Sequence, residues 1–140
     1  MTILALIPAH NEANGIAATI TSLRQQSHPP DRIVVVADNC TDDTATIATD
    51  GGAEVFTTQG NTARKAGALN QAISSLPDLP EHVLVMDADT TLAPQFVQTA
   101  LRRFRGDRGL AAVGGIFSGP PPSGMLETAQ GNEFARYGRE

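Results

Sequence analysis

Three short apolar runs, each followed by polar residues, are the feature of this 140-residue sequence that most limits its possible folds. Residues 3–7, 33–37 and 83–86 are almost entirely aliphatic, and many of them are β-branched. A strand covered on both faces has this composition, whereas a strand with one wet face alternates apolar and polar residues. The runs therefore predict buried parallel strands, and Pro8 is expected to stop the first of them.

Segments with helical periodicity separate these runs. Ile16, Ile20 and Leu23 fall at i, i+4 and i+7, which predicts one apolar helix face. Further helices are expected over residues 44–49 and 62–75 and from Pro94 onward, and shorter strands over 53–57 and 110–115. Alternating strands and helices with short connections predict an α/β fold with a mostly parallel sheet flanked by helices.

Composition limits the class of protein. The net charge of −5 and the lack of a basic run argue against a nucleic-acid partner. The sequence has no run of 18 consecutive apolar residues, so no membrane span is expected. A core strand is predicted almost directly after Met1, which leaves no room for a signal peptide. The single cysteine, Cys40, fits a reducing compartment. We therefore expect a soluble, cytoplasmic domain.

Polar side chains gather where the predicted strands end. Glu12 follows the first strand, Asp38 and Asn39 follow the second, and Asp87 and Asp89 follow the fourth. Ligands of doubly wound sheets bind outside the carboxyl ends of the strands, near the switch in strand order. The three strand exits together predict a ligand site at this edge.

Asp87 and Asp89 have two interpretations. Spaced i, i+2 at the end of a buried strand, they would share one side and provide oxygen ligands for a divalent cation that also grips a diphosphate. In the alternative, one carboxylate caps the next helix and the other is solvated. The position directly after a buried strand favours the metal site.

Other ligand classes lack their motifs. A dinucleotide fold needs Gly-x-Gly-x-x-Gly after the first strand, and a P-loop needs Gly-Lys-Ser/Thr, and this sequence has neither. Arg64 or Lys65 at the start of the third helix is placed to meet phosphate, so the outline is that of a nucleoside-diphosphate site. His28 and His82 stand at element ends and are expected to be exposed.

Four segments together resemble the family 2 glycosyltransferases of the GT-A fold. They read IPAHNEA, VVVADNCTDDTA, RKAGALNQAI and VLVMDADTTLAP, in that order, within residues 3 to about 96. The resemblance implies a metal-dependent, inverting transferase that uses a nucleotide-sugar, expected to be a UDP-sugar, with Mg²⁺ or Mn²⁺. It also implies a nucleotide-sugar site formed by Pro8, Ala9, Glu12, Asp38, Asn39, Lys65, Gly67, Asp87, Ala88 and Asp89.

The resemblance also assigns individual roles. Glu12 would reach the ribose or uracil, and Asp38 would accept a hydrogen bond from the base. Lys65 would lie along the donor. Asp89 would coordinate the metal directly, and Asp87 would contact hydroxyl groups and the metal side.

One part of the family pattern is missing. Inverting transfer needs a general base, which in this family is an aspartate far beyond the Asp-x-Asp pair. The only later aspartate here, Asp107, comes too early, so the catalytic residue is unknown. Either the chain is a truncated piece of a longer enzyme, which we favour, or it is a naturally short relative.

The expected organisation is a GT-A nucleotide-sugar-binding domain over 1–117, a Pro/Gly-rich loop over 118–124, and a helix over 125–140 leading to the missing acceptor-side half. The apolar stripe of that last helix, which includes Phe134 and Tyr137, makes self-association into a homo-oligomer plausible. The acceptor stays unknown. Two alternatives stay open: a non-catalytic nucleotide-binding or self-assembling module, and a nucleotidyltransferase, although the Gly-rich loop of the latter is absent.

Overall fold

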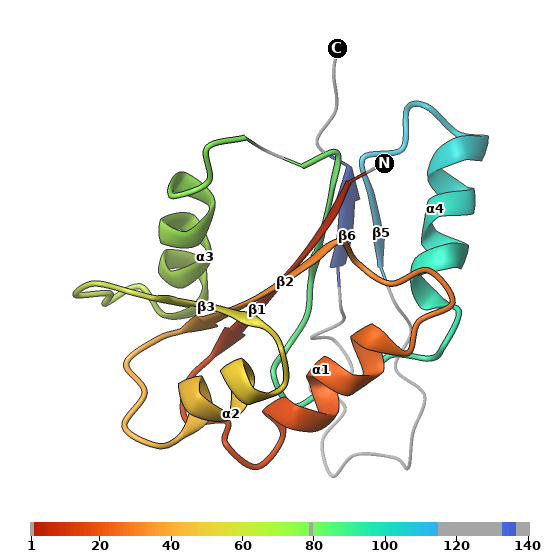
Figure 1. Ribbon diagram of the computed structural model, residues 1–140. Helices are drawn as coiled ribbons and strands as arrows, with labels where there is room; N and C mark the ends of the chain where they lie inside the picture. Colours follow the sequence, from red (N-terminus) through yellow and green to blue (C-terminus); the bar gives the residue numbers. More distant parts are fainter. Residues whose placement is uncertain (1, 79, 115–132, 137–140) are drawn as a thin grey trace, which may run out of the picture.

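Strands and helices alternate along the chain, as the apolar runs predict. The computed structural model describes residues 2–78, 80–114 and 133–136. In chain order the elements are β1 (Ile3–Ala9), α1 (Ile16–Arg24), β2 (Arg32–Ala37), α2 (Thr44–Asp50), β3 (Glu54–Thr57), α3 (Arg64–Ser74), β4 (His82–Val85), α4 (Phe96–Gly106), β5 (Ala112–Gly114) and β6 (Glu133–Arg136) (Figure 1).

The strands form one mixed sheet in the order β3-β2-β1-β4-β6-β5. β1 pairs in parallel with both β2 and β4, and β2 pairs in parallel with β3. β6 is antiparallel to both β4 and β5. The chain builds outward from β1 to β3 and then returns to the other side of β1 as β4. This places the switch in strand order between β1 and β4, and the predicted mostly parallel sheet is confirmed.

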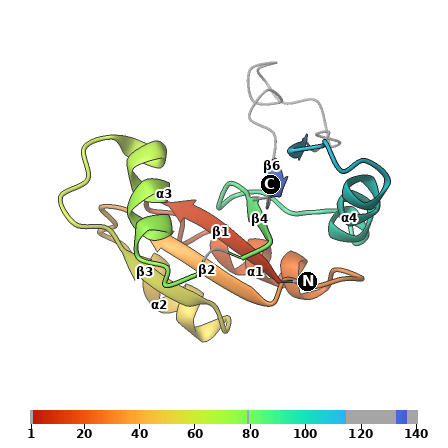
Figure 2. The same cartoon turned by 90° about the horizontal axis from the view of Figure 1, so that it is seen from above.

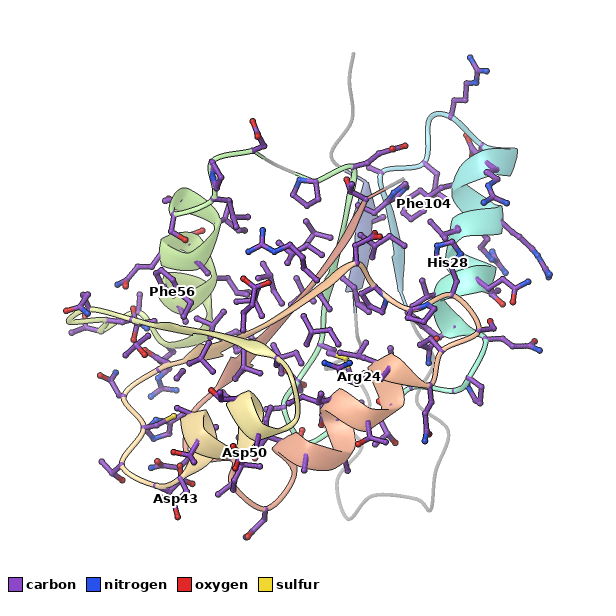
Figure 3. All side chains as sticks on the ribbon, viewed as in Figure 1. Arg24, His28, Asp43, Asp50, Phe56 and Phe104 are labelled. Atoms are coloured by element: carbon purple, nitrogen blue, oxygen red, sulfur yellow. The ribbon has the colours of Figure 1, made fainter. Side chains whose placement is uncertain are left out.

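β1 is buried on both faces because its side chains enter two different cores. Ile3, Ala5 and Ile7 belong to the larger core, which also contains residues of α1, α2 and α4. Leu4 and Leu6 belong to the smaller core, which is covered by α3. Figure 2 shows the strands with α3 on one side and α1 and α2 on the other. The labelled Phe56 and Phe104 in Figure 3 lie between the sheet and α3 and between the sheet and α4, respectively.

Pro8 does not stop the first strand, contrary to the prediction, because β1 continues to Ala9. The backbone carbonyl of Leu6 accepts a hydrogen bond from Met86 N at 3.2 Å, so the backbone polar groups of Leu6 point towards β4. Pro8, two residues later, directs its backbone to the same side. The last pair of the β1–β4 ladder is Leu6 with Val85. Pro8 lies beyond that pair, so its missing N–H costs no ladder hydrogen bond.

Two other predictions need correction. β4 ends at Val85, so Asp87 and Asp89 lie in the turn after the strand and not on its last residues. The helix predicted over 125–140 is wrong for Glu133–Arg136, which form β6. The rest of that helix and the 118–124 loop lie outside the described residues. In the part of the chain that the structure describes, no helix is long and apolar enough to cross a membrane.

Candidate functional site

A cavity of about 990 Å³ lies at the carboxyl ends of β1, β2 and β4. This edge of the sheet is next to the start of α3 (Figure 1). Parallel strands bring their exit loops together here, as the switch-point rule expects. The residues that line the cavity are Pro8, Ala9, His10, Glu12, Asp38, Asn39, Asn61, Thr62, Arg64, Lys65, Ala68, Leu69, Val85, Met86, Asp87, Ala88 and Asp89.

Three of the cavity-lining side chains at the exits of β1 and β4 are carboxylates, Glu12, Asp87 and Asp89. Partial burial raises the pKa of Glu12, and the negative charges of Asp89, Asp42 and Asp87 raise it further, against a smaller opposing effect of His10. Lys65 pairs with Asp87 through an ion pair between two partly exposed side chains. Like charges this close favour the binding of an additional cation.

A divalent metal would need ligands beyond these side chains. No group of three or more His, Cys, Asp or Glu side chains arranged to hold a metal exists within the described ranges. Asp87 and Asp89 can therefore supply one or two oxygens, and a bound phosphate and waters would supply the rest. That partly hydrated coordination suits Mg²⁺ or Mn²⁺ bound together with a diphosphate.

The turn that carries these acids is anchored to α1. The Thr19 hydroxyl donates to the carbonyl of Ala88 at 2.7 Å, and Thr90 N donates to the carbonyl of Asp87 at 3.2 Å. Gly15 packs against the backbone of Asp89, where an added Cβ would lie 3.3 Å from its Cα. Asp89 therefore projects from a fixed turn at the cavity edge, and its own side chain is exposed.

Asp38 has a different environment, built from neutral donors. It is buried, at 8% exposure, at the end of β2. Thr58 Oγ1 and Asn61 Nδ2 donate to its Oδ1 at 2.7 Å and 2.8 Å. Its carbonyl lies 2.8 Å from His10 Nδ1. This carboxylate is held in one orientation at the cavity wall.

The backbone is left-handed at three places around the cavity. Asn11, Asn39 and Arg64 have φ of 53°, 52° and 53°. Asparagine tolerates this conformation, and Asn11 also accepts a hydrogen bond from Thr41 N at 2.7 Å through Oδ1. Arginine rarely adopts the left-handed conformation. The backbone is therefore strained at Arg64, the first residue of α3, beside the cavity.

Nearly all of the sequence-predicted site residues line this cavity, and Gly67 is the exception. Pro8, Ala9, Glu12, Asp38, Asn39, Lys65 and the 87–89 turn are brought together. The close approach at Gly67 is made by Asn61, whose Oδ1 would be 2.0 Å from an added Cβ. The functional candidates that the sequence did not single out are Thr58 and Asn61. Thr58 directly follows β3 and Asn61 lies four residues after the end of that strand, and the position after a strand is a weak signal here because β3 has only four residues.

The family described as Glycosyl transferase family 2 matches residues 5–137. A 4,4'-diaponeurosporenoate glycosyltransferase from Staphylococcus aureus is 32% identical over 115 residues, which are 77% of this chain and 30% of that protein. The chain therefore spans less than a third of the length of that relative.

Two solved structures share the fold. Mannosyl-3-phosphoglycerate synthase from Rubrobacter xylanophilus superposes with a TM-score of 0.79 at 22% identity, covering 97% of this chain and 54% of that one. The second is glucosyl-3-phosphoglycerate synthase from Mycobacterium tuberculosis in complex with Mn²⁺, uridine diphosphate and glucosyl-3-phosphoglycerate. It superposes with a TM-score of 0.76 at 22% identity, covering 96% of this chain and 56% of that one. The chain thus spans about half of each and shares their GT-A architecture. The match over residues 5–137 shows that this chain belongs to glycosyltransferase family 2.

Proposed function

We propose that this chain is the donor-binding part of a metal-dependent, inverting glycosyltransferase. The donor is a nucleotide-sugar, most simply a UDP-sugar, and the acceptor is a hydroxyl group. The observation that carries the proposal is the convergence of Asp38, Lys65, Asp87 and Asp89 on one cavity at the strand exits. Glucosyl-3-phosphoglycerate synthase, which has the same fold, forms a complex with uridine diphosphate and Mn²⁺, and this supports the choice of ligand.

Two parts of the cavity would bind different parts of the donor: the surroundings of Asp38 would bind the base, and the Asp87–Asp89 turn would bind the diphosphate. Asp38, held by neutral donors, offers an acceptor to the base. Glu12, in the loop between β1 and α1, would lie between the base and the metal and would contact the ribose. The apolar part of the cavity wall is formed by Pro8, Ala9 and Ala88. Asn39 lines the cavity next to Asp38, on the side assigned to the base. These contacts orient the nucleotide across the exits of β1, β2 and β4.

The diphosphate belongs at the Asp87–Asp89 turn. Asp89 and Asp87 would hold Mg²⁺ or Mn²⁺, and the metal would neutralise the negative charge that develops on the departing diphosphate. Lys65, which pairs with Asp87 in the structure, is placed to exchange that partner for a phosphate oxygen when the donor binds. A cationic side chain at this position then helps to stabilise the leaving group.

The general base does not come from Asp107. This residue ends α4, its Oδ1 accepts a hydrogen bond from Gly109 N at 2.9 Å, and it is not among the cavity-lining residues. We propose that the base lies outside the described residues. The assignment of residues 1–117 to donor binding, and of the segments that follow to a connection with an acceptor-side half, belongs to the same proposal.

Calorimetric titration of UDP into the 140-residue chain, first with Mn²⁺ and then with EDTA, tests the proposal. We expect binding that EDTA weakens strongly, because two carboxylates and a diphosphate repel one another without a cation. Equal affinity in both conditions would contradict a metal-dependent donor site. Absence of binding by a folded sample would contradict the whole proposal.

The alternative function is a non-catalytic nucleotide-binding module that acts through self-assembly. It predicts nucleotide binding with no transfer under any condition, and an oligomer at the concentrations used for titration. Hydrolysis of a UDP-sugar by the chain with Mn²⁺, followed by release of the sugar, would contradict it.

A further inference from the structure

Asp38 is held by two buried side chains from the segment between β3 and α3. Thr58 and Asn61 are each 8% exposed, and both donate to Asp38 Oδ1, at 2.7 Å and 2.8 Å. Asn39 Nδ2 adds a longer contact to the same oxygen at 3.4 Å. A carboxylate oxygen has two lone pairs, so Oδ1 is saturated. Among the described residues none donates to Oδ2, which is left as the one open acceptor.

Three hydrogen bonds hold the amide of Asn61 in place. Its Nδ2 also donates to the carbonyl of Arg64 at 2.8 Å, and its Oδ1 accepts from Ala63 N at 3.0 Å. Because Nδ2 meets two acceptors and Oδ1 meets an N–H, the orientation of the amide is fixed by the network. Asn61 thus joins the end of β2 to the first turn of α3.

Gly67 makes room for this amide. A Cβ at Gly67 would lie 2.0 Å from Asn61 Oδ1 and 2.8 Å from Ala63 Cβ, much closer than real carbon atoms approach. The backbone of Gly67 is helical, so the glycine is needed here for space and not for its conformational freedom. A side chain at this position would push Asn61 away from Asp38.

We propose that Asn61 is a positioning residue that leaves Asp38 with a single free acceptor and thereby sets the base selectivity of the donor site. The inference rests on the proposed function. Uracil presents one N–H between two carbonyls on its pairing edge, and a single oxygen satisfies it. Guanine presents two adjacent donors, which require both oxygens of a carboxylate, and cytosine and adenine present an acceptor where an N–H is needed. With Oδ1 saturated, the site favours uracil over guanine.

The test measures the affinities of Asn61→Ala and wild type for UDP, GDP and Mn²⁺–pyrophosphate by calorimetry. Loss of one hydrogen bond to a charged group should weaken UDP about tenfold. GDP should lose less, because Oδ1 becomes available for its second donor, so the UDP/GDP preference should narrow by a factor of up to about ten. Binding of Mn²⁺–pyrophosphate should change by less than about twofold, since the metal side is untouched. Asn70→Ala, an exposed residue of α3, is the matched control.

Variants of Gly67 and Thr58 keep the test independent of any one substitution. Gly67→Ala should reproduce the loss of UDP affinity and the narrowed UDP/GDP preference, because the added Cβ would displace the Asn61 amide. Gly106→Ala, where an added Cβ meets nothing within 4 Å, is its control. Thr58→Val should behave like Asn61→Ala, whereas Thr58→Ser, which keeps the hydroxyl, should stay within about twofold of wild type.

The outcomes separate the two proposals. Wild-type affinity and UDP/GDP preference in Asn61→Ala and Gly67→Ala, with UDP still bound through Mn²⁺, would overturn only the role of Asn61. Equal losses of UDP and Mn²⁺–pyrophosphate would also overturn it, because they would indicate a general structural role. Failure of the wild-type chain to bind UDP at all would overturn the proposed function and this inference together.

Discussion

The acidic residues of the cavity fall into two kinds of environment. Asp38 is surrounded by neutral hydrogen-bond donors, which stabilise a carboxylate without cancelling its charge. The charges of Asp87 and Asp89 act on Glu12, and among the described side chains only Lys65 forms an ion pair with this group, through Asp87. Under the proposed function, we therefore expect the second group to need an added cation when a diphosphate binds, and the first group not to need one.

Separate substitutions of Asp89 and Asp38 should distinguish metal-dependent diphosphate binding from binding of the base. Asp89→Ala should abolish the part of UDP affinity that depends on Mn²⁺ and leave metal-free uridine binding within about twofold. Asp38→Ala should weaken uridine about tenfold with or without metal. Calorimetry with uridine and UDP, with Mn²⁺ or EDTA, makes each variant the control of the other. A loss in Asp38→Ala that is seen only with metal would remove Asp38 from the base pocket.

Glu12 should make the chain less stable as the pH rises. Its pKa is raised above 4.5, chiefly by burial and then by neighbouring carboxylates. Between the ordinary and the raised pKa the native state holds more protons than the unfolded state, so the free energy of unfolding falls with increasing pH. Glu12→Gln removes this effect. Its melting temperature should therefore exceed that of wild type at pH 7, and the excess should shrink towards pH 4.

Asp42 should show a pH dependence of opposite sign. The Thr44 hydroxyl, as a hydrogen-bond donor, is the main cause that lowers the pKa of Asp42 below 3.8. The stability from this group is present above its ordinary pKa and is lost as the pH falls through the lowered value. Asp42→Asn should reduce stability at pH 7 and matter less in acid. A Glu12→Gln difference that is constant over this pH range would contradict the assigned environment.

The start of α4 is fixed by a side chain from the end of α1. The N-cap residue of α4, Gln95, makes no side-chain capping hydrogen bond. Instead, the buried Gln26 accepts from Val97 N at 3.0 Å through Oε1 and donates to the carbonyl of Ala93 at 2.7 Å through Nε2. One amide thus satisfies a free N–H of the first helical turn and ties α4 to α1.

Gln26→Leu should show how much this link contributes. The substitution keeps the approximate volume but leaves the buried Val97 N–H without a partner, which costs about 1–3 kcal/mol, whereas the exposed Ala93 carbonyl still accepts from Phe96 N at 3.0 Å. Urea unfolding should give a free energy of unfolding lower by on the order of 1–3 kcal/mol. The neighbouring exposed Gln25→Leu should stay within about 0.5 kcal/mol of wild type. An equally small effect of Gln26→Leu would show that α4 is held by its apolar face alone.

Ligand binding at the strand exits involves the whole sheet. The cavity is formed by residues that follow β1, β2 and β4 and by the start of α3. A nucleotide that contacts Asp38 and the 87–89 turn at once bridges both sides of β1. Such a ligand binds the native state and not the unfolded chain, in which these residues are far apart.

UDP with Mn²⁺ should therefore raise the melting temperature of the chain. At a free concentration 100 times the dissociation constant, the native state gains about 2.7 kcal/mol, which corresponds to roughly 8 °C for a chain of this size. Differential scanning fluorimetry measures the shift. EDTA should remove most of it, and Asp89→Ala should show none of the metal-dependent part. An unchanged melting temperature at concentrations that saturate the titration would contradict binding to the native site.

The sequence alone determined the elements and most of the site. Strands that are buried on both faces are apolar at every position, so they can be recognised in the sequence as continuous apolar runs. The acids after each run follow from the same pattern, so the cavity-lining Glu12, Asp38, Asp87 and Asp89 were found without coordinates. Family resemblance then indicated their ligand.

Tertiary structure decided what depends on contacts between distant residues. The order β3-β2-β1-β4 and the antiparallel β6 follow from packing, since the apolar runs of β1, β2 and β4 look alike in sequence. His82, expected at the surface, is 1% exposed and lies against Phe104, with ring centroids 5.1 Å apart. The bonds of Asn61 to Asp38 and of Gln26 to Val97 span 23 and 71 residues. No local pattern encodes such pairs, because they exist only once the sheet has brought the loops and helices together.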